Sequence, residues 1–148
     1  MNGHTFGSAE TPVIEVHGLF KSFASRQRGS RVRAIDGLDL EVRRSETFGL
    51  LGADGAGKTT TLRLMNGLLR PDSGAVRVAG YDTVTEFRRI HRRVGYMPQQ
   101  FALYGDMTVS ENLGLFADLY GLTRAQKAER IPRLLRFARL GQFGGRRA

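Results

Sequence analysis

Gly52-Ala53-Asp54-Gly55-Ala56-Gly57-Lys58-Thr59 is the stretch that decides the fold, because it joins an apolar run over 47–51 to a segment with helical spacing. Glycines let a backbone curve so that its N–H groups point at phosphate oxygens, while a lysine adds positive charge and a hydroxyl can ligate Mg²⁺. Strand, glycine-rich loop and helix in this order are typical of a P-loop. The sequence therefore predicts a triphosphate-binding α/β domain, the alternative being an ordinary glycine-rich turn.

Composition limits the possible architectures. The chain has 148 residues, 41% of them hydrophobic, and no cysteine. This length suits one domain with one core, and the lack of cysteine excludes disulfides and thiolate metal sites. Residues 1–12 are polar and end at Pro12, which is typical of a disordered tail rather than a signal peptide. No apolar run reaches the length of a membrane span.

The net charge of +9 rests almost wholly on arginine, since only Lys21, Lys58 and Lys127 are lysines among the 23 basic residues. Such a charge suits a nucleic-acid surface, proximity to anionic lipid headgroups, or ordinary solvated helix faces. The arginines are not interleaved with aromatic residues, and no nucleic-acid-binding module is recognisable. No nucleic-acid partner is therefore expected.

Periodicity predicts the elements before and directly after the glycine-rich loop. Residues 13–16 and 38–42 read as half-buried strands of an antiparallel opening section, separated by a loop over 25–33. The lack of alternation over 47–51 indicates a strand covered on both faces. The helix that begins at Lys58 should stop near Arg70, because the following proline disfavours a helical conformation in the residue before it.

The second half of the chain alternates turns, strands and helices. Pro71–Gly74 is a turn signal, and strands are predicted over 75–79 and 93–97. Thr108 followed by Glu111 is typical of a helix N-terminus, and this helix should end before Gly121. A second helical stretch begins at Thr123. Pro132 lies inside it, where proline costs about 3 kcal/mol, so we expect a break or kink.

In this order and spacing, the motifs resemble the nucleotide-binding domain of ABC transporters over about residues 13–147. The segments that carry the resemblance are Leu19–Phe23, Phe48–Thr60, Leu68–Gly74, Val94–Gln99, Leu103–Tyr104 and Thr108–Leu113. Within this family, the sequences of these motifs are most similar to those of exporters of the drug-efflux or ABC-2 type. The resemblance implies a P-loop NTPase core with an antiparallel β subdomain at the N-terminus, the start of an ABC-type helical subdomain, and an incomplete sheet.

The same resemblance divides the chain and assigns roles to residues. Residues 1–12 would be the tail and 13–148 a partial nucleotide-binding domain, with the β subdomain and P-loop core over 13–100 and the helical subdomain over 101–148. Phe23 aligns with the aromatic residue that stacks on adenine, the alternative being a core or loop phenylalanine. The expected ATP contacts in the loop are Gly52, Asp54, Gly55, Ala56, Gly57, Lys58, Thr59 and Thr60.

Two residues are assigned to catalysis and two to the metal. Lys58 would contact the β- and γ-phosphates, and the hydroxyl of Thr59 would ligate Mg²⁺. Gln99 matches the Q-loop glutamine, whose amide oxygen faces Mg²⁺ or the attacking water; the alternatives are Gln100 or a polar turn after the preceding proline. Asp54 stands where the family commonly has asparagine, so modestly altered affinity for ATP is expected.

Several family features have no match in this sequence. No LSGGQ signature and no Walker B strand ending in Asp-Glu follow the loop, and the three histidines all precede Gln99. The chain therefore resembles the N-terminal portion of a domain and is expected to be hydrolysis-incompetent by itself, whereas the intact parent would be an ATPase that powers export.

The resemblance implies two kinds of partner: transmembrane permease subunits and a second nucleotide-binding domain, in a homodimer or heterodimer. It implies a cytoplasmic protein peripheral on the cytoplasmic face of the membrane. Two alternatives stay open: a non-hydrolytic nucleotide-binding or interaction fragment, and another P-loop enzyme such as a small kinase or GTPase.

Overall fold

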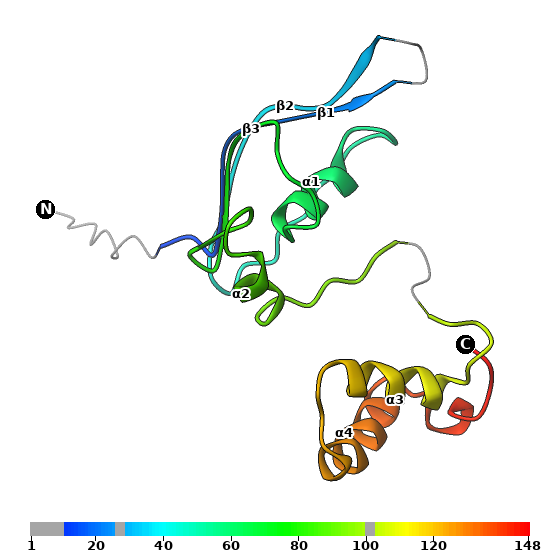
Figure 1. Ribbon diagram of the computed structural model, residues 1–148. Helices are drawn as coiled ribbons and strands as arrows, with labels where there is room; N and C mark the ends of the chain where they lie inside the picture. Colours follow the sequence, from blue (N-terminus) through cyan, green and yellow to red (C-terminus); the bar gives the residue numbers. More distant parts are fainter. Residues whose placement is uncertain (1–10, 26–28, 100–102) are drawn as a thin grey trace, which may run out of the picture. The chain divides into compact units, whose positions relative to one another are not determined.

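The computed structural model describes residues 11–25, 29–99 and 103–148 (Figure 1). The chain divides into two compact units, Met1–Tyr96 and Met97–Ala148. Within the described part of the chain, no helix combines the length and the apolar character needed to span a bilayer.

The first unit is built on a four-stranded sheet of order β2-β1-β3-β4, in which each neighbouring pair is antiparallel. Its strands are β1 (Ile14–Ala24), β2 (Arg31–Val42), β3 (Ser73–Val78) and β4 (Tyr81–Asp82). The long β1–β2 hairpin confirms the predicted antiparallel opening. β3 occupies the strand predicted over 75–79 apart from its last residue.

Two predicted connections are shorter than expected. Residues 31–33, predicted as loop, begin β2, and Ser73 and Gly74, predicted as turn, begin β3. Arg31 pairs with Ala24, and Ser73 pairs with Phe20. Pairing with β1 therefore outweighs the weak local strand preference of these residues.

The strands predicted over 47–51 and 93–97 are wrong, because neither segment has strand structure in this chain. A strand is stabilised by hydrogen bonds to a neighbour, and the sheet of the described residues places no strand beside either segment. The side chains of Leu51 and Met97 are 95% and 92% exposed. Leu51, in the run that was expected to be covered on both faces, therefore stays exposed, whereas Val94 of the second segment packs against the core without belonging to a strand.

Helix α1 (Lys58–Met65) packs against the sheet and closes the core of the first unit (Figure 1). It ends before the predicted boundary near Arg70, because Gly67 adopts a left-handed conformation with φ 64°. The N–H of Gly67 donates to the carbonyl oxygen of Leu64 at 3.0 Å, and the N–H of Leu68 to that of Arg63 at 2.9 Å. This pair of bonds is the usual helix-ending turn around a glycine.

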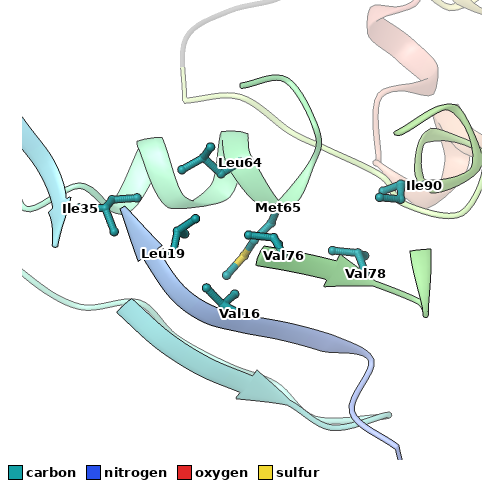
Figure 2. Close-up of a cluster of buried hydrophobic side chains, with 8 residues drawn as sticks. All are labelled: Val16, Leu19, Ile35, Leu64, Met65, Val76, Val78 and Ile90. Atoms are coloured by element: carbon teal, nitrogen blue, oxygen red, sulfur yellow. The ribbon is translucent and has the colours of Figure 1, made fainter. Parts of the chain in front are cut away.

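The core lies between α1 and the sheet (Figure 2). Its buried side chains are Val16, Leu19, Ile35, Leu64, Met65, Val76, Val78 and Ile90. In β1 the buried positions change from even to odd numbers at a bulge around Gly18, whose N–H donates to Asp39 Oδ1 at 2.7 Å. Ile90 comes from a short helix that was not predicted, α2 (Phe87–His91).

The second unit holds helices α3 (Val109–Leu119) and α4 (Arg124–Phe137), followed by a short 3₁₀ helix, Gly141–Phe143. The predicted N-terminus of α3 is confirmed: the N–H of Glu111 donates to Thr108 Oγ1 at 3.1 Å, and the N–H of Thr108 donates to Glu111 Oε2 at 2.7 Å. Side chains of α3 and α4 line an apolar hollow of about 270 Å³.

Helix α4 runs unbroken through Pro132, so the expected break is wrong. Both ends of the helix are fixed: Thr123 and Gln126 form a second capping box, and the N–H of Leu140 donates to the carbonyl oxygen of Leu135 at 2.8 Å. These bonds and the packing against α3 offset the local cost of the proline, which is about 3 kcal/mol.

Candidate functional site

The glycine-rich loop is held in shape by its glycines and by Lys58. Gly55 and Gly57 have φ values of 81° and 87°, in the left-handed region that side-chain-bearing residues avoid. The Nζ of Lys58 donates to the carbonyl oxygens of Gly52 and Ala53, both at 2.7 Å. The loop therefore curls around the ammonium group at the start of α1.

The start of α1 presents backbone donors. Within the described residues, the N–H groups of Lys58, Thr59 and Thr60 have no acceptor, whereas the N–H of Thr61 donates to the carbonyl oxygen of Gly57 at 2.8 Å. These donors and the positive end of the helix dipole favour an anion. The exposed hydroxyl of Thr59 has no partner among the described residues either, and such an oxygen suits Mg²⁺.

One of the backbone N–H groups expected to bind phosphate is already used within the loop. The N–H of Ala56 donates within the loop, to the carbonyl oxygen of Ala53 at 3.2 Å. Asp54 is exposed at the tip of the loop, so its carboxylate stands in water. The donors that fit a phosphate group therefore concentrate at the first turn of α1.

The loop is seated directly on β2. A Cβ atom on Gly57 would lie 2.3 Å from the carbonyl oxygen of Ala34. Ala34 is the extra residue of a bulge, because Lys21 pairs with Ile35 while Ser22 pairs with Arg33. Only glycine fits this contact, which fixes the glycine-rich loop against the β1–β2 hairpin.

Phe23 lies near the end of the same hairpin, opposite Val32. Phe23 is 40% exposed and does not belong to the core, and the Nζ of Lys21 lies 5.6 Å from the centroid of its ring. An aromatic face of this kind is available for stacking on a planar group. The first unit thus carries the aromatic residue and the glycine-rich loop on directly connected elements.

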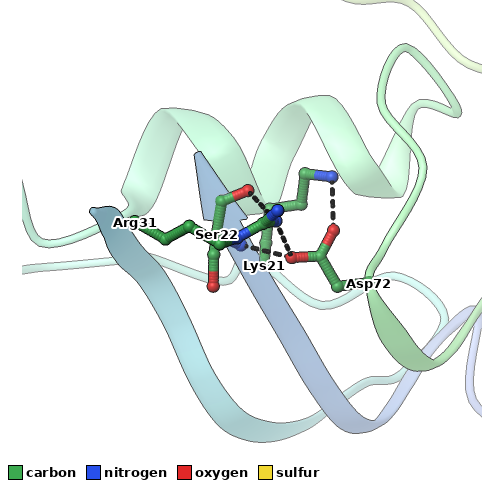
Figure 3. Close-up of polar contacts among 4 residues, drawn as sticks. All are labelled: Lys21, Ser22, Arg31 and Asp72. Atoms are coloured by element: carbon green, nitrogen blue, oxygen red, sulfur yellow. Dashed lines mark hydrogen bonds and ion pairs between the residues drawn. The ribbon is translucent and has the colours of Figure 1, made fainter. Parts of the chain in front are cut away.

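Asp72, which lies in a predicted turn and in one of the segments that carry the family resemblance, joins both strands of this hairpin (Figure 3). Its carboxylate accepts from Lys21 Nζ at 2.9 Å, from the N–H of Ser22 at 2.7 Å and from Arg31 Nη2 at 3.2 Å. The Lys21 hydrogen bond above all, and then the Ser22 N–H, hold the pKa of Asp72 below its ordinary value. Local sequence gives no signal for a contact across 50 residues.

Gln99 belongs to the second unit, where it is exposed in a bend. Gln100 lies outside the described residues. A residue of this unit that sequence reasoning missed is Asn112, whose side chain is buried and whose Oδ1 accepts from the N–H of Tyr104 at 2.9 Å. Its Nδ2 donates to the carbonyl oxygens of Tyr104, Met107 and Thr108, so it shapes the segment that leads into α3.

The family profile described as ABC transporter matches residues 35–148. The chain belongs to the ABC transporter family. It is 44% identical over 136 residues to the probable multidrug ABC transporter ATP-binding protein YbhF of Escherichia coli, covering 92% of this chain and 23% of that protein. It is 49% identical over 130 residues to the Nod factor export ATP-binding protein I of Cupriavidus metallidurans, covering 88% and 41%.

Solved structures agree with this assignment. A structure of an ATP-binding subunit of an ABC transporter is 32% identical, with a TM-score of 0.68, and the match covers 90% of this chain and 53% of that one. The ATP-binding cassette MJ0796, solved as a dimer with ADP and Pi, shares the fold at 20% identity with a TM-score of 0.77, covering 90% and 61%. The predicted ABC nucleotide-binding domain and its partial α/β P-loop fold are confirmed. The chain spans 23% and 41% of the length of the two curated relatives above.

Proposed function

We propose that this chain binds MgATP through residues 52–60, as part of the ATP-binding subunit of an ABC transporter that exports its substrate. The observation that carries the proposal is the arrangement at the start of α1: the Lys58 ammonium is held by a loop shaped by glycines, and the first backbone N–H groups of the helix find no acceptor in the described part of the chain. A bound triphosphate supplies the phosphoanhydride bond whose hydrolysis releases free energy.

Each residue then has a physical task. Lys58 and the N–H groups of the first turn of α1 bind phosphate oxygens, and Thr59 supplies one oxygen to Mg²⁺. Phe23 stacks on the base, which contributes on the order of 1–3 kcal/mol without selecting one particular base. Gln99 offers its amide oxygen to Mg²⁺ or to the attacking water.

The larger assembly is part of the proposal. Two nucleotide-binding domains would bind each other and the transmembrane permease, at the cytoplasmic face of the membrane, and ATP hydrolysis would drive export by the longer protein. Support comes from relatives whose names describe multidrug transport and Nod factor export. The dimeric cassette with ADP and Pi supports only the fold of such a domain.

The test is equilibrium binding of MgATP to the chain and to three variants. Lys58→Ala should abolish saturable binding, because it removes the charge held over the loop. Lys127→Ala is the matched control, since it removes a lysine of α4 that pairs with Asp118 and should leave affinity unchanged. Asp54→Asn should raise affinity up to about fivefold, because a carboxylate near phosphates costs about 1 kcal/mol in water. Equal binding by Lys58→Ala and the unmodified chain would contradict the proposal.

A further inference from the structure

The Asp72 carboxylate connects the two strands that carry and flank Phe23 (Figure 3). Its Oδ1 accepts from Lys21 on β1, and its Oδ2 accepts both from the N–H of Ser22 on β1 and from Arg31 on β2. Arg31 Nη2 also donates to the carbonyl oxygen of Ser22 at 3.3 Å. One side chain therefore fastens the residue before Phe23 and the residue before its partner Val32.

Asp72 is itself held in place by the strand it fastens. Its backbone N–H donates to the carbonyl oxygen of Phe20 at 2.9 Å, and Ser73, the next residue, starts β3. The carboxylate therefore projects from a backbone that is already part of the sheet. A group anchored in this way can restrain its partners rather than follow them.

The end of the hairpin needs such a restraint. Ala24 and Arg31 form the last pair of the β1–β2 ladder, and one further hydrogen bond follows it, from the N–H of Ser25 to the carbonyl oxygen of Ser30 at 2.9 Å. Phe23, beside that last pair, is 40% exposed and is not part of the buried core cluster. Hairpin ends fray when few buried contacts hold them. The position of the ring is therefore set by the backbone of the hairpin end, which the Asp72 carboxylate ties to the sheet.

The other end of the site is fixed by a different contact on the same strand. Ala34 in the β2 bulge touches Gly57 of the glycine-rich loop, which sets where the loop lies relative to β2. Two separate contacts therefore position the two parts of the site: Gly57 against Ala34 for the loop, and Asp72 against the hairpin end for the aromatic ring.

We propose that Asp72 is a positioning residue for base recognition, which holds the end of the β1–β2 hairpin so that Phe23 meets the base of a nucleotide whose phosphates the loop binds. This inference rests on the proposed function. It predicts that removing the Asp72 carboxylate weakens the binding of a ligand that has a base and leaves the binding of phosphates alone nearly unchanged.

The experiment compares two ligands, MgATP and magnesium tripolyphosphate, which has the phosphates but no base. Asp72→Ala should weaken MgATP binding about 3- to 10-fold and change tripolyphosphate binding less than about twofold. Asp72→Asn, which can still accept from the Ser22 N–H, should give an intermediate loss and serves as the variant least disturbing to the fold. Asp36→Asn is the matched control, because Asp36 pairs with Arg33 on the same hairpin at 2.9 Å, and it should change neither affinity.

A double-mutant cycle with Phe23→Ala separates positioning from general support of the fold. In the Phe23→Ala background, Asp72→Ala should cause no further loss of MgATP affinity. Equal losses for both ligands, or additive effects in the cycle, would overturn the inference. If the unmodified chain binds neither ligand, the proposed function itself fails. If the unmodified chain binds both ligands and Asp72→Ala binds both with the same affinities, only the inference about Asp72 fails.

Discussion

Replacing Gly57 with alanine tests how the loop is seated on the hairpin. The added Cβ would lie 2.3 Å from the carbonyl oxygen of Ala34, about 1 Å closer than an ordinary carbon–oxygen contact. This oxygen belongs to the backbone of β2 and cannot swing away. Ala34 also adjoins Ile35, which is part of the core, so the bulge cannot move freely.

The cost has two parts that a second variant separates. A non-glycine residue in the left-handed region costs about 1–2 kcal/mol, and forcing the loop off β2 adds about 1–3 kcal/mol. Gly55→Ala carries only the first part, because Gly55 has a similar φ of 81° and, apart from its chain neighbours, no atom of the described residues lies within 4 Å of an added Cβ. Both substitutions change the unfolded chain equally.

Urea unfolding followed by circular dichroism measures the difference. Gly57→Ala should reduce the free energy of unfolding by about 2–5 kcal/mol and Gly55→Ala by about 1–2 kcal/mol. Magnesium tripolyphosphate binding should be weaker in Gly57→Ala, because the loop must shift. Equal unfolding midpoints for the two variants would refute the role given to the Ala34 carbonyl.

The remaining predictions concern α4 and acid stability. Pro132→Ala should raise the free energy of unfolding by up to about 3 kcal/mol in the same urea assay, because it restores an N–H that can donate to the carbonyl oxygen of Ala128; an unchanged midpoint would contradict this. The Lys21 hydrogen bond lowers the pKa of Asp72, and the N–H of Thr85 lowers that of Asp82. The folded-state pKa values of both carboxyl groups lie below the ordinary value of about 3.9. The stability that the two ionised carboxylates give the fold is therefore complete above that pH and is lost as the pH falls through the lower folded-state pKa values. Unfolding monitored between pH 6 and pH 2 should show this decline, with a shallower slope in Asp72→Asn, and an identical slope in that variant would count against it.

Features that depend on neighbouring residues could be predicted from the sequence. The helix start at Lys58, the capping box of Thr108 and Glu111, and the helix end before Gly121 all rest on bonds within a few residues. The glycine-rich loop belongs to this group, because its shape follows from glycines and one lysine. Family resemblance then supplied roles for residues whose order is distinctive.

Features that depend on distant partners could not be predicted in the same way. The apolar runs over 47–51 and 93–97 have strand composition, but a strand exists only where another strand lies beside it. Asp72 reads as a turn residue because its partners Lys21 and Arg31 lie far away in sequence. The bulge at Ala34 could not be predicted either, because it depends on the register of β1 against β2 and not on the residue type at that position.

The two bonds from Lys58 to the carbonyl oxygens of Gly52 and Ala53 have a consequence for binding kinetics. A loop that its own lysine holds together has already lost its conformational entropy when the chain folds, so an arriving anion does not have to order it. Association should then follow a single fast phase, as for a rigid receptor, with differences in affinity appearing mainly in the rate of dissociation.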